Sequence, residues 1–288
     1  MKAYLRFLAA VALLVMLGGC GKQAFIPSDR TIHDTPERYA VIAREHCIPV
    51  EKGVTLHGWW LEPIKGNTKG TIVVANGIAS NSSECFKKWL WAVDAGYDLF
   101  IFDYRGYGRS TGSFDVNGFI DDATAALRYV EAHSAKPIIV VGQSMGGSIV
   151  AAALARNVFP SVELAVIDST FISFASISDA IIRRSVLLWL LHWVPYTVIP
   201  YHVNAMENVP EIDVPLLFVA GMEDKVVPPS HTGILYAKAT APKWLWFSER
   251  SGHVRSFDNP EVRRAFIELI GDIEGAYRRS DDSSRIFR

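Results

Sequence analysis

The sequence contains the three side-chain types of a serine nucleophile, its base and its acid. Ser144 lies inside the pentapeptide Gly-Gln-Ser-Met-Gly, Asp224 ends the segment Gly-Met-Glu-Asp, and His253 ends Ser-Gly-His. A serine hydroxyl is a weak nucleophile until a neighbouring base takes its proton, and imidazole does this near neutral pH. A carboxylate then fixes the histidine tautomer and stabilises the imidazolium that forms. These groups suit acyl transfer through a covalent acyl-enzyme.

The pentapeptide around Ser144 lies between a strand pattern and a helix pattern. Residues 137–141 are Pro-Ile-Ile-Val-Val, and residues 149–155 are small or apolar and compatible with a helix. A strand, a sharp turn and a helix are the context in which G-x-S-x-G forms a nucleophile elbow. The two glycines lack the Cβ atoms that would block the turn. The alternative is an ordinary glycine-rich turn between a strand and a helix.

Short apolar runs, each ended by a small or polar residue, recur along the chain. They cover residues 71–75, 99–102, 138–141, 164–167 and 216–220. Continuous apolar runs separated by helix-length segments are typical of a parallel sheet buried on both faces. We therefore predict an α/β fold with a mostly parallel central sheet and helices on both faces.

Further elements are expected on both sides of these runs. Residues 40–50 and 54–62 are predicted to form an antiparallel hairpin, and residues 243–248 the last strand. Residues 119–133 and 260–277 are predicted to be helices, the second with Pro260 in its first turn.

The predicted strands also place the partners of Ser144. Catalytic residues in open α/β sheets gather beyond the carboxyl ends of the strands. Asp224 follows the run that ends at residue 220, and His253 follows the last predicted strand. Glu223, which adjoins Asp224, and Asp168, which ends the preceding strand, remain alternatives for the acid.

An oxyanion intermediate needs two N–H groups aimed at its developing charge. We expect one from the backbone amide of Met145, directly after the nucleophile. The second is expected from the loop Asn76-Gly-Ile after the first parallel strand, and we assign it to the backbone amide of Ile78.

Five segments, in their order along the chain, resemble the successive motifs of the α/β-hydrolase superfamily. They are Asn76-Gly-Ile, Asp103-Tyr-Arg-Gly-Tyr-Gly-Arg-Ser, Gly142-Gln-Ser-Met-Gly, Gly221-Met-Glu-Asp and Gly252-His. The resemblance covers roughly residues 40–275 and is closest to the serine-aminopeptidase-like and monoglyceride-lipase-like branch. It implies the α/β-hydrolase fold and a serine hydrolase activity. Such relatives usually have histidine where this chain has Asn76, so the hydrogen bonding of that loop is expected to differ.

One long segment interrupts the alternation of strands and helices. Almost fifty residues, rich in apolar side chains and broken by prolines at 195, 200 and 210, separate residue 167 from residue 216. This is too long for a simple connection, so we predict a small helical cap over about residues 171–212. Its apolar side chains favour an acyl or aromatic substrate.

The first twenty residues differ from the rest of the chain. Lys2 and Arg6 precede the apolar run Phe7–Leu17, and Gly-Gly-Cys20 follows. The run is too short to span a bilayer comfortably and is typical of a secretory signal. Small residues before a cysteine resemble a bacterial lipobox, which implies lipidation of Cys20 and anchoring in the cell envelope, at the outer membrane where the source has one. A plain signal peptide or a short membrane anchor is the alternative.

The expected organisation is a signal peptide over residues 1–19, a tether over 20–39, one α/β-hydrolase domain over 40–278 and a flexible tail over 279–288. A net charge of −1 without a basic run gives no indication of nucleic-acid binding. No cluster of histidine, cysteine and aspartate has metal-ligand spacing, so neither a metal nor a cofactor is expected.

Two cysteines remain besides Cys20. Cys47 and Cys85 are predicted to be free, partly buried thiols, although an oxidising compartment would also permit a disulfide.

These features predict a membrane-tethered serine hydrolase that cleaves carboxylic esters of a small acyl or lipid-like molecule. Ser144 would attack the acyl carbon, His253 would shuttle the proton, and Asp224 would orient His253. A peptidase or amidase of the same fold is one alternative. A non-catalytic envelope lipoprotein that binds a lipid or a protein is the other, because fold alone does not prove activity.

Overall fold

The computed structural model describes residues 29–64, 66–78, 80–183, 189–194, 203–278 and 284–288. The predicted signal peptide, Cys20 and the first part of the tether lie outside these residues, as do parts of the predicted cap and tail.

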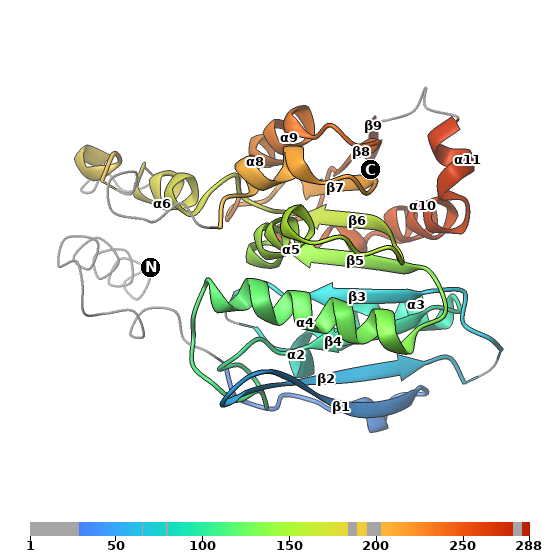
Figure 1. Ribbon diagram of the computed structural model, residues 1–288. Helices are drawn as coiled ribbons and strands as arrows, with labels where there is room; N and C mark the ends of the chain where they lie inside the picture. The colour runs from blue at the N-terminus through green and yellow to red at the C-terminus, as the bar shows by residue number, and fades with distance from the viewer. Residues whose placement is uncertain (1–28, 65, 79, 184–188, 195–202, 279–283) are drawn as a thin grey trace.

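A nine-stranded sheet forms the centre of the molecule (Figure 1). Its strands are β1 Ile42–Glu51, β2 Val54–Glu62, β3 Thr71–Ala75, β4 Asp98–Phe102, β5 Ile138–Gln143, β6 Val162–Asp168, β7 Leu216–Gly221, β8 Lys243–Ser248 and β9 Ser284–Phe287. Their order in the sheet is β1-β2-β4-β3-β5-β6-β7-β8-β9. The hairpin β1–β2 and the pair β2–β4 are antiparallel, and every other pair is parallel. The predicted α/β fold with a mostly parallel sheet is confirmed.

Helices cover both faces of the sheet. They are α2 Ser82–Cys85, α3 Leu90–Asp94, α4 Gly118–His133, α5 Met145–Arg156, α6 Phe174–Arg183, α8 Ala205–Asn208, α9 Pro229–Lys238, α10 Pro260–Gly271 and α11 Ile273–Arg278. Short 3₁₀ helices are η1 Pro36–Arg38, η2 Phe86–Trp89, η3 Trp189–Leu191, η4 Val209–Glu211 and η5 Ser256–Asp258. The predicted helix over residues 260–277 is divided into α10 and α11, because Asp272 between them leaves the helical conformation.

The continuous apolar runs follow from this layering. Neighbouring residues of a strand point to opposite faces, so a strand that is covered on both faces needs apolar side chains throughout. Val73 of β3 packs in one buried cluster with Ile149 of α5. Ile72 packs in a second cluster with Phe266 of α10, on the other face.

The lead-in before β1 is fixed to the body of the protein. Residues 29–39 were predicted to belong to a tether, but Gly108 N and Asn81 Nδ2 both donate hydrogen bonds to Asp29 O, at 2.9 and 3.1 Å. Tyr39 packs edge-on against Phe86. The tether prediction is therefore wrong for this part of the chain, because its polar residues find partners in the loops after β3 and β4.

The end of the chain also differs from the prediction. Residues 284–287 were expected within a flexible tail, yet they form β9 and pair in parallel with β8. Phe287 is buried against Trp246, with ring centroids 5.3 Å apart. Four residues carry too short a pattern to be recognised as a strand, and here the exposed edge of β8 supplies the partner.

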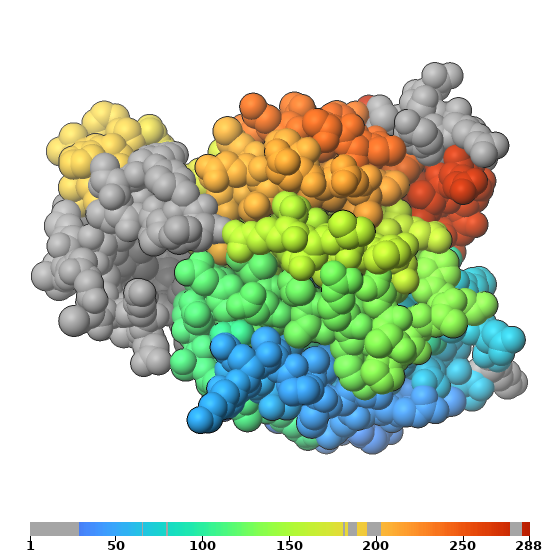
Figure 2. Space-filling model, in the orientation of Figure 1, coloured from blue at the N-terminus to red at the C-terminus, as the bar shows by residue number. Residues whose placement is uncertain are grey.

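The first helix in the described part of the predicted cap is α6, beyond the carboxyl end of β6 (Figure 1). Figure 2 shows the segment of α6 and η3, in yellow, projecting from the body of the molecule. Trp189, Leu190 and Trp193 are exposed there. By contrast, α8 packs against α5 and α9 in the layer that covers the sheet. Among the described residues, none of the helices combines the length and apolar character needed to cross a bilayer.

Candidate active site

Ser144 lies at the sharp turn between β5 and α5. Its backbone φ of 54° and ψ of −117° are a conformation that residues other than glycine rarely adopt. A Cβ added to Gly146 would lie 2.1 Å from the carbonyl oxygen of Ala75. At Gly142, an added Cβ would lie 2.5 Å from the Cα of Gly147. Only glycine fits at both positions, so the turn has the close packing of a nucleophile elbow.

The three side chains chosen from the sequence meet at the carboxyl edge of the sheet. His253 Nε2 lies 3.0 Å from Ser144 Oγ, and His253 Nδ1 lies 2.8 Å from Asp224 Oδ2. Ser144 and Asp224 are buried, whereas the His253 side chain is 23% exposed. A continuous line of hydrogen bonds therefore joins the hydroxyl to the carboxylate through the imidazole. This is the arrangement in which a base can take the serine proton while the acid holds the ring.

Asp224, rather than either alternative, accepts the hydrogen bond from His253. Its other oxygen, Oδ1, accepts from the backbone amides of Val226 and Val227 at 2.7 and 2.9 Å, which fixes the carboxylate. The side chain of Glu223 is exposed.

Asp168 is fully buried beside this line of residues but has other partners. Its Oδ2 accepts from Gln143 Nε2 at 3.0 Å, and its Oδ1 accepts from Ser169 Oγ at 3.1 Å. Burial raises the pKa of Asp168 to about 6, although these hydrogen bonds and the nearby His253 act in the opposite direction.

The two segments that carry the amides assigned to the oxyanion hole lie beside the nucleophile. Met145 is the first residue of α5, where N–H groups have no acceptor within the helix. Ile78 follows Gly77, and a Cβ added to Gly77 would lie 3.3 Å from the Cβ of Ser144. The loop after β3 therefore passes directly beside the serine, as an oxyanion loop must.

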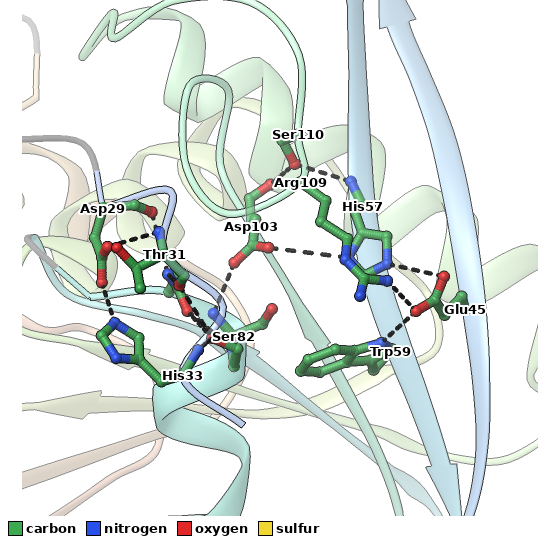
Figure 3. Close-up of polar contacts among 12 residues, drawn as sticks. Asp29, Thr31, His33, Glu45, His57, Trp59, Ser82, Asp103, Arg109 and Ser110 are labelled. Carbon is green, nitrogen blue, oxygen red and sulfur yellow. Dashed lines mark hydrogen bonds and ion pairs between the residues drawn. The ribbon is translucent and has the colours of Figure 1, made fainter. Parts of the chain in front are cut away.

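Polar contacts fix the far end of that loop (Figure 3). Ser82 N donates to Asp103 Oδ1 at 2.6 Å, which ties the start of α2 to the residue after β4. Asn81 Nδ2 donates to the carbonyl oxygens of Asp29 and Thr31, at 3.1 and 2.7 Å. Sequence reasoning missed Asn81 because its partners lie in the segment that was predicted to be a tether.

Asn76 differs from the histidine that the resemblance leads one to expect. The residue is 2% exposed, and its Oδ1 and Nδ2 find no hydrogen-bond partner among the described residues. A buried amide without partners is energetically unfavourable.

His57, on strand β2, is a buried histidine that is not hydrogen-bonded to Ser144. Its Nε2 is 3.6 Å from Glu45 Oε2, and its Nδ1 is 3.9 Å from Asp103 Oδ2 (Figure 3). Both carboxylates face the ring at distances longer than a hydrogen bond, and the ring packs edge-on against Trp59.

One group of side chains has metal-ligand types in close proximity. Ligand atoms of Asp29, His33 and Glu84 all lie within 4.8 Å of one another. His33 Nε2 already pairs with Asp29 Oδ2 at 2.6 Å, so a cation would have to displace that contact. The sequence did not indicate this group, because Glu84 is far from the other two along the chain.

The two cysteines of the domain are free thiols, as predicted. Cys85 is buried, whereas Cys47 is exposed rather than partly buried.

Known proteins resemble this chain in both sequence and fold. Residues 66–202 match the family described as serine aminopeptidase, S33. The chain is 27% identical to the uncharacterized protein YfhR of Salmonella typhimurium over an alignment of 287 positions that covers 93% of each chain. It is 29% identical over 250 residues to the alpha/beta hydrolase domain-containing protein WAV2 of Arabidopsis thaliana, covering 81% of this chain and 79% of that one.

Solved esterase structures have the same fold. The Pyrococcus furiosus esterase Pf2001 superposes with a TM-score of 0.67 at 21% identity, over 86% of this chain and 96% of that one. The acetyl xylan esterase from Paenibacillus sp. R4 gives a TM-score of 0.60 at 17% identity, over 81% and 90% of the two chains. The elbow, the strand order and these matches together show that the chain has the α/β-hydrolase fold.

Proposed function

We propose that the protein is a serine-dependent hydrolase of carboxylic esters. The observation that carries the proposal is the line of hydrogen bonds from Asp224 through His253 to Ser144, with the oxyanion loop beside it. The esterases among its structural neighbours share the fold, which makes esters the first substrate class to test.

In this mechanism Ser144 Oγ attacks the acyl carbon while His253 Nε2 accepts the hydroxyl proton. The backbone amides of Met145 and Ile78 stabilise the oxyanion of the tetrahedral intermediate. The imidazolium then gives its proton to the departing alcohol, and the acyl group remains bound to Ser144 Oγ as an ester. Water attacks this acyl-enzyme with His253 again as the base, which releases the carboxylic acid and restores the serine. Asp224 keeps the ring oriented throughout.

Two observations bear on the substrate. The exposed apolar side chains of Trp189, Leu190 and Trp193 in the cap segment support an acyl or lipid-like ester. The match to a family described as serine aminopeptidases supports peptide or amide hydrolysis as the second candidate. Initial rates on esters of graded acyl length, compared with aminopeptidase substrates, separate the two.

Labelling with a fluorophosphonate tests the proposal directly. The wild-type protein should be labelled at one serine, and Ser144→Ala should abolish the label. Ser148→Ala is the matched control. It removes a buried serine hydroxyl in α5 but leaves the hydrogen bonds between Ser144, His253 and Asp224 intact. An unlabelled wild type, or equal labelling of Ser144→Ala, would favour a non-catalytic protein that uses the fold to bind a lipid or another protein.

We also propose that the protein is a lipoprotein of the bacterial cell envelope, anchored through Cys20. The support is the apolar run followed by Leu-Gly-Gly-Cys in the sequence.

A further inference from the structure

Three residues other than glycine have a positive φ in the described part of the chain, and all three border the active site. They are Ser144, Ser169 and Val254, with φ of 54°, 53° and 55°. Ser144 is the proposed nucleophile, and Val254 follows the proposed base. Such a conformation costs on the order of 1–3 kcal/mol per residue, so the surrounding contacts must hold it in place.

Hydrogen bonds of Asp168 and Ser169 connect the backbone of Ser144 with that of Val254. The backbone oxygen of Asp168 accepts from Ser144 N at 2.8 Å. The hydroxyl Oγ of Ser169 accepts from Val254 N at 3.2 Å and donates to Asp168 Oδ1 at 3.1 Å. One hydroxyl can donate once and accept twice, so both bonds can exist together. Asp168 Oδ2 also binds the side chain of Gln143, the residue before the nucleophile.

The central sheet fixes the backbone of Asp168 and Ser169. Asp168 ends β6, opposite Gln143 of β5 on one side and Val219 of β7 on the other. Ser169 N donates to Val219 O at 2.8 Å. Asp168 and Ser169 are 0% and 1% exposed, so water does not compete for these bonds.

We propose that Asp168 and Ser169 are positioning residues that set the separation of His253 Nε2 from Ser144 Oγ. Asp168 holds the backbone of the nucleophile, and Ser169 holds the backbone directly after the base. Without the Ser169 bond, the loop that carries His253 loses an anchor, although the catalytic side chains themselves stay intact. The inference rests on the proposed hydrolase function, because it concerns the same site.

The test compares two substitutions at residue 169. Ser169→Gly removes the hydroxyl but adopts a positive φ without strain, so the fold is expected to persist. Ser169→Asn also tolerates a positive φ and restores a side-chain oxygen that can accept from Val254 N. We expect Ser169→Gly to lower kcat and the fluorophosphonate labelling rate by about 10–100-fold, because small displacements of catalytic groups are costly. KM should change little, and Ser169→Asn should recover most of the loss.

The control is Thr232→Val in α9, which removes a buried hydroxyl that lies away from these bonds and should keep wild-type kcat. Equal kcat for Ser169→Gly and wild type, or equally low kcat for the glycine and asparagine variants, would overturn the positioning role. Either result leaves the proposed function standing so long as the wild type is labelled at Ser144. An unlabelled wild type would instead refute the proposed function itself.

Discussion

At the scale of single residues, the buried carboxyl group of Asp168 beside the active site makes the stability of the fold depend on pH. Burial raises its pKa to about 6, whereas an aspartate in the unfolded chain has a pKa near 3.9. Between these two values the folded chain binds more protons than the unfolded one. As pH rises from about 4 to about 6, Asp168 therefore lowers the free energy of unfolding, by up to about 3 kcal/mol.

Asp168→Asn should remove this pH dependence. Asparagine has nearly the same shape and can still accept from Gln143 Nε2, but it cannot ionise. We expect the free energy of unfolding of the variant, relative to wild type, to rise by up to about 3 kcal/mol between pH 4 and pH 7. Denaturant unfolding at several pH values measures the difference, with Asp213→Asn at an exposed carboxyl as control. A difference that stays constant over this range would contradict the argument.

The residues of the site differ in how visible they are in the sequence. Ser144, Asp224 and His253 each follow a strong strand pattern, and chain order alone pairs them across more than a hundred residues. The sequence favoured Asp224 as the acid but left Asp168 as an alternative, because Asp168 ends one buried strand and Asp224 closely follows another. The choice depends on which carboxylate reaches His253 Nδ1, and that is a matter of loop geometry. The role of Ser169 depends on one hydrogen bond, which its hydroxyl accepts from the backbone amide of Val254. The pattern of apolar and polar residues does not indicate such a bond.

At the scale of elements, Asn81 joins the oxyanion loop to the lead-in. Its Oδ1 caps α2 by accepting from Ser83 N at 3.0 Å, while its Nδ2 binds the carbonyl oxygens of Asp29 and Thr31. Asn81→Ala should cost about 1–2 kcal/mol for the lost cap and also release the lead-in. Limited proteolysis should then cut within residues 29–33 at a rate well above that of wild type.

Asn204→Ala is the matched control for this prediction. Asn204 caps α8 in the same way, by accepting from Met206 N at 3.1 Å, but its side chain does not contact the lead-in. Its substitution should cost similar stability and leave the lead-in protected. Equal protease resistance of residues 29–33 in the wild type and the Asn81→Ala variant would show that other contacts hold this segment.

Elements with long apolar patterns were predictable, and those that depend on a partner were not. Strands β3 and β5 are buried along their whole length and stand out as unbroken apolar runs. By contrast, β9 has three exposed residues and only Phe287 buried, so its sequence resembles a polar tail. This segment is a strand because it pairs with the edge of β8, and the local sequence does not indicate that pairing.

At the scale of the whole molecule, the active site, the cap segment and the lead-in share one edge of the sheet. Ser144, Asp224 and His253 follow the carboxyl ends of β5, β7 and β8. Asp29 is bound to Asn81 and Gly108, in the loops that follow β3 and β4. The strands β3, β5 and β6 point toward α6 in Figure 1. A lipid on Cys20 would therefore be attached on the active-site side of the molecule.

The length of the lead-in makes this arrangement testable. Eight residues lie between Cys20 and Asp29, and an extended chain that joins the two spans at most about 30 Å. If Cys20 is acylated, the active-site edge lies within that distance of the membrane. Cys20→Ala should then release the protein from membranes and slow the hydrolysis of esters embedded in vesicles, while a soluble short-chain ester is hydrolysed at the wild-type rate. Cys47→Ala, at an exposed free thiol, should change neither property. A Cys20→Ala protein that still fractionates with membranes, together with a wild type that carries no lipid, would rule out Cys20 as the anchor.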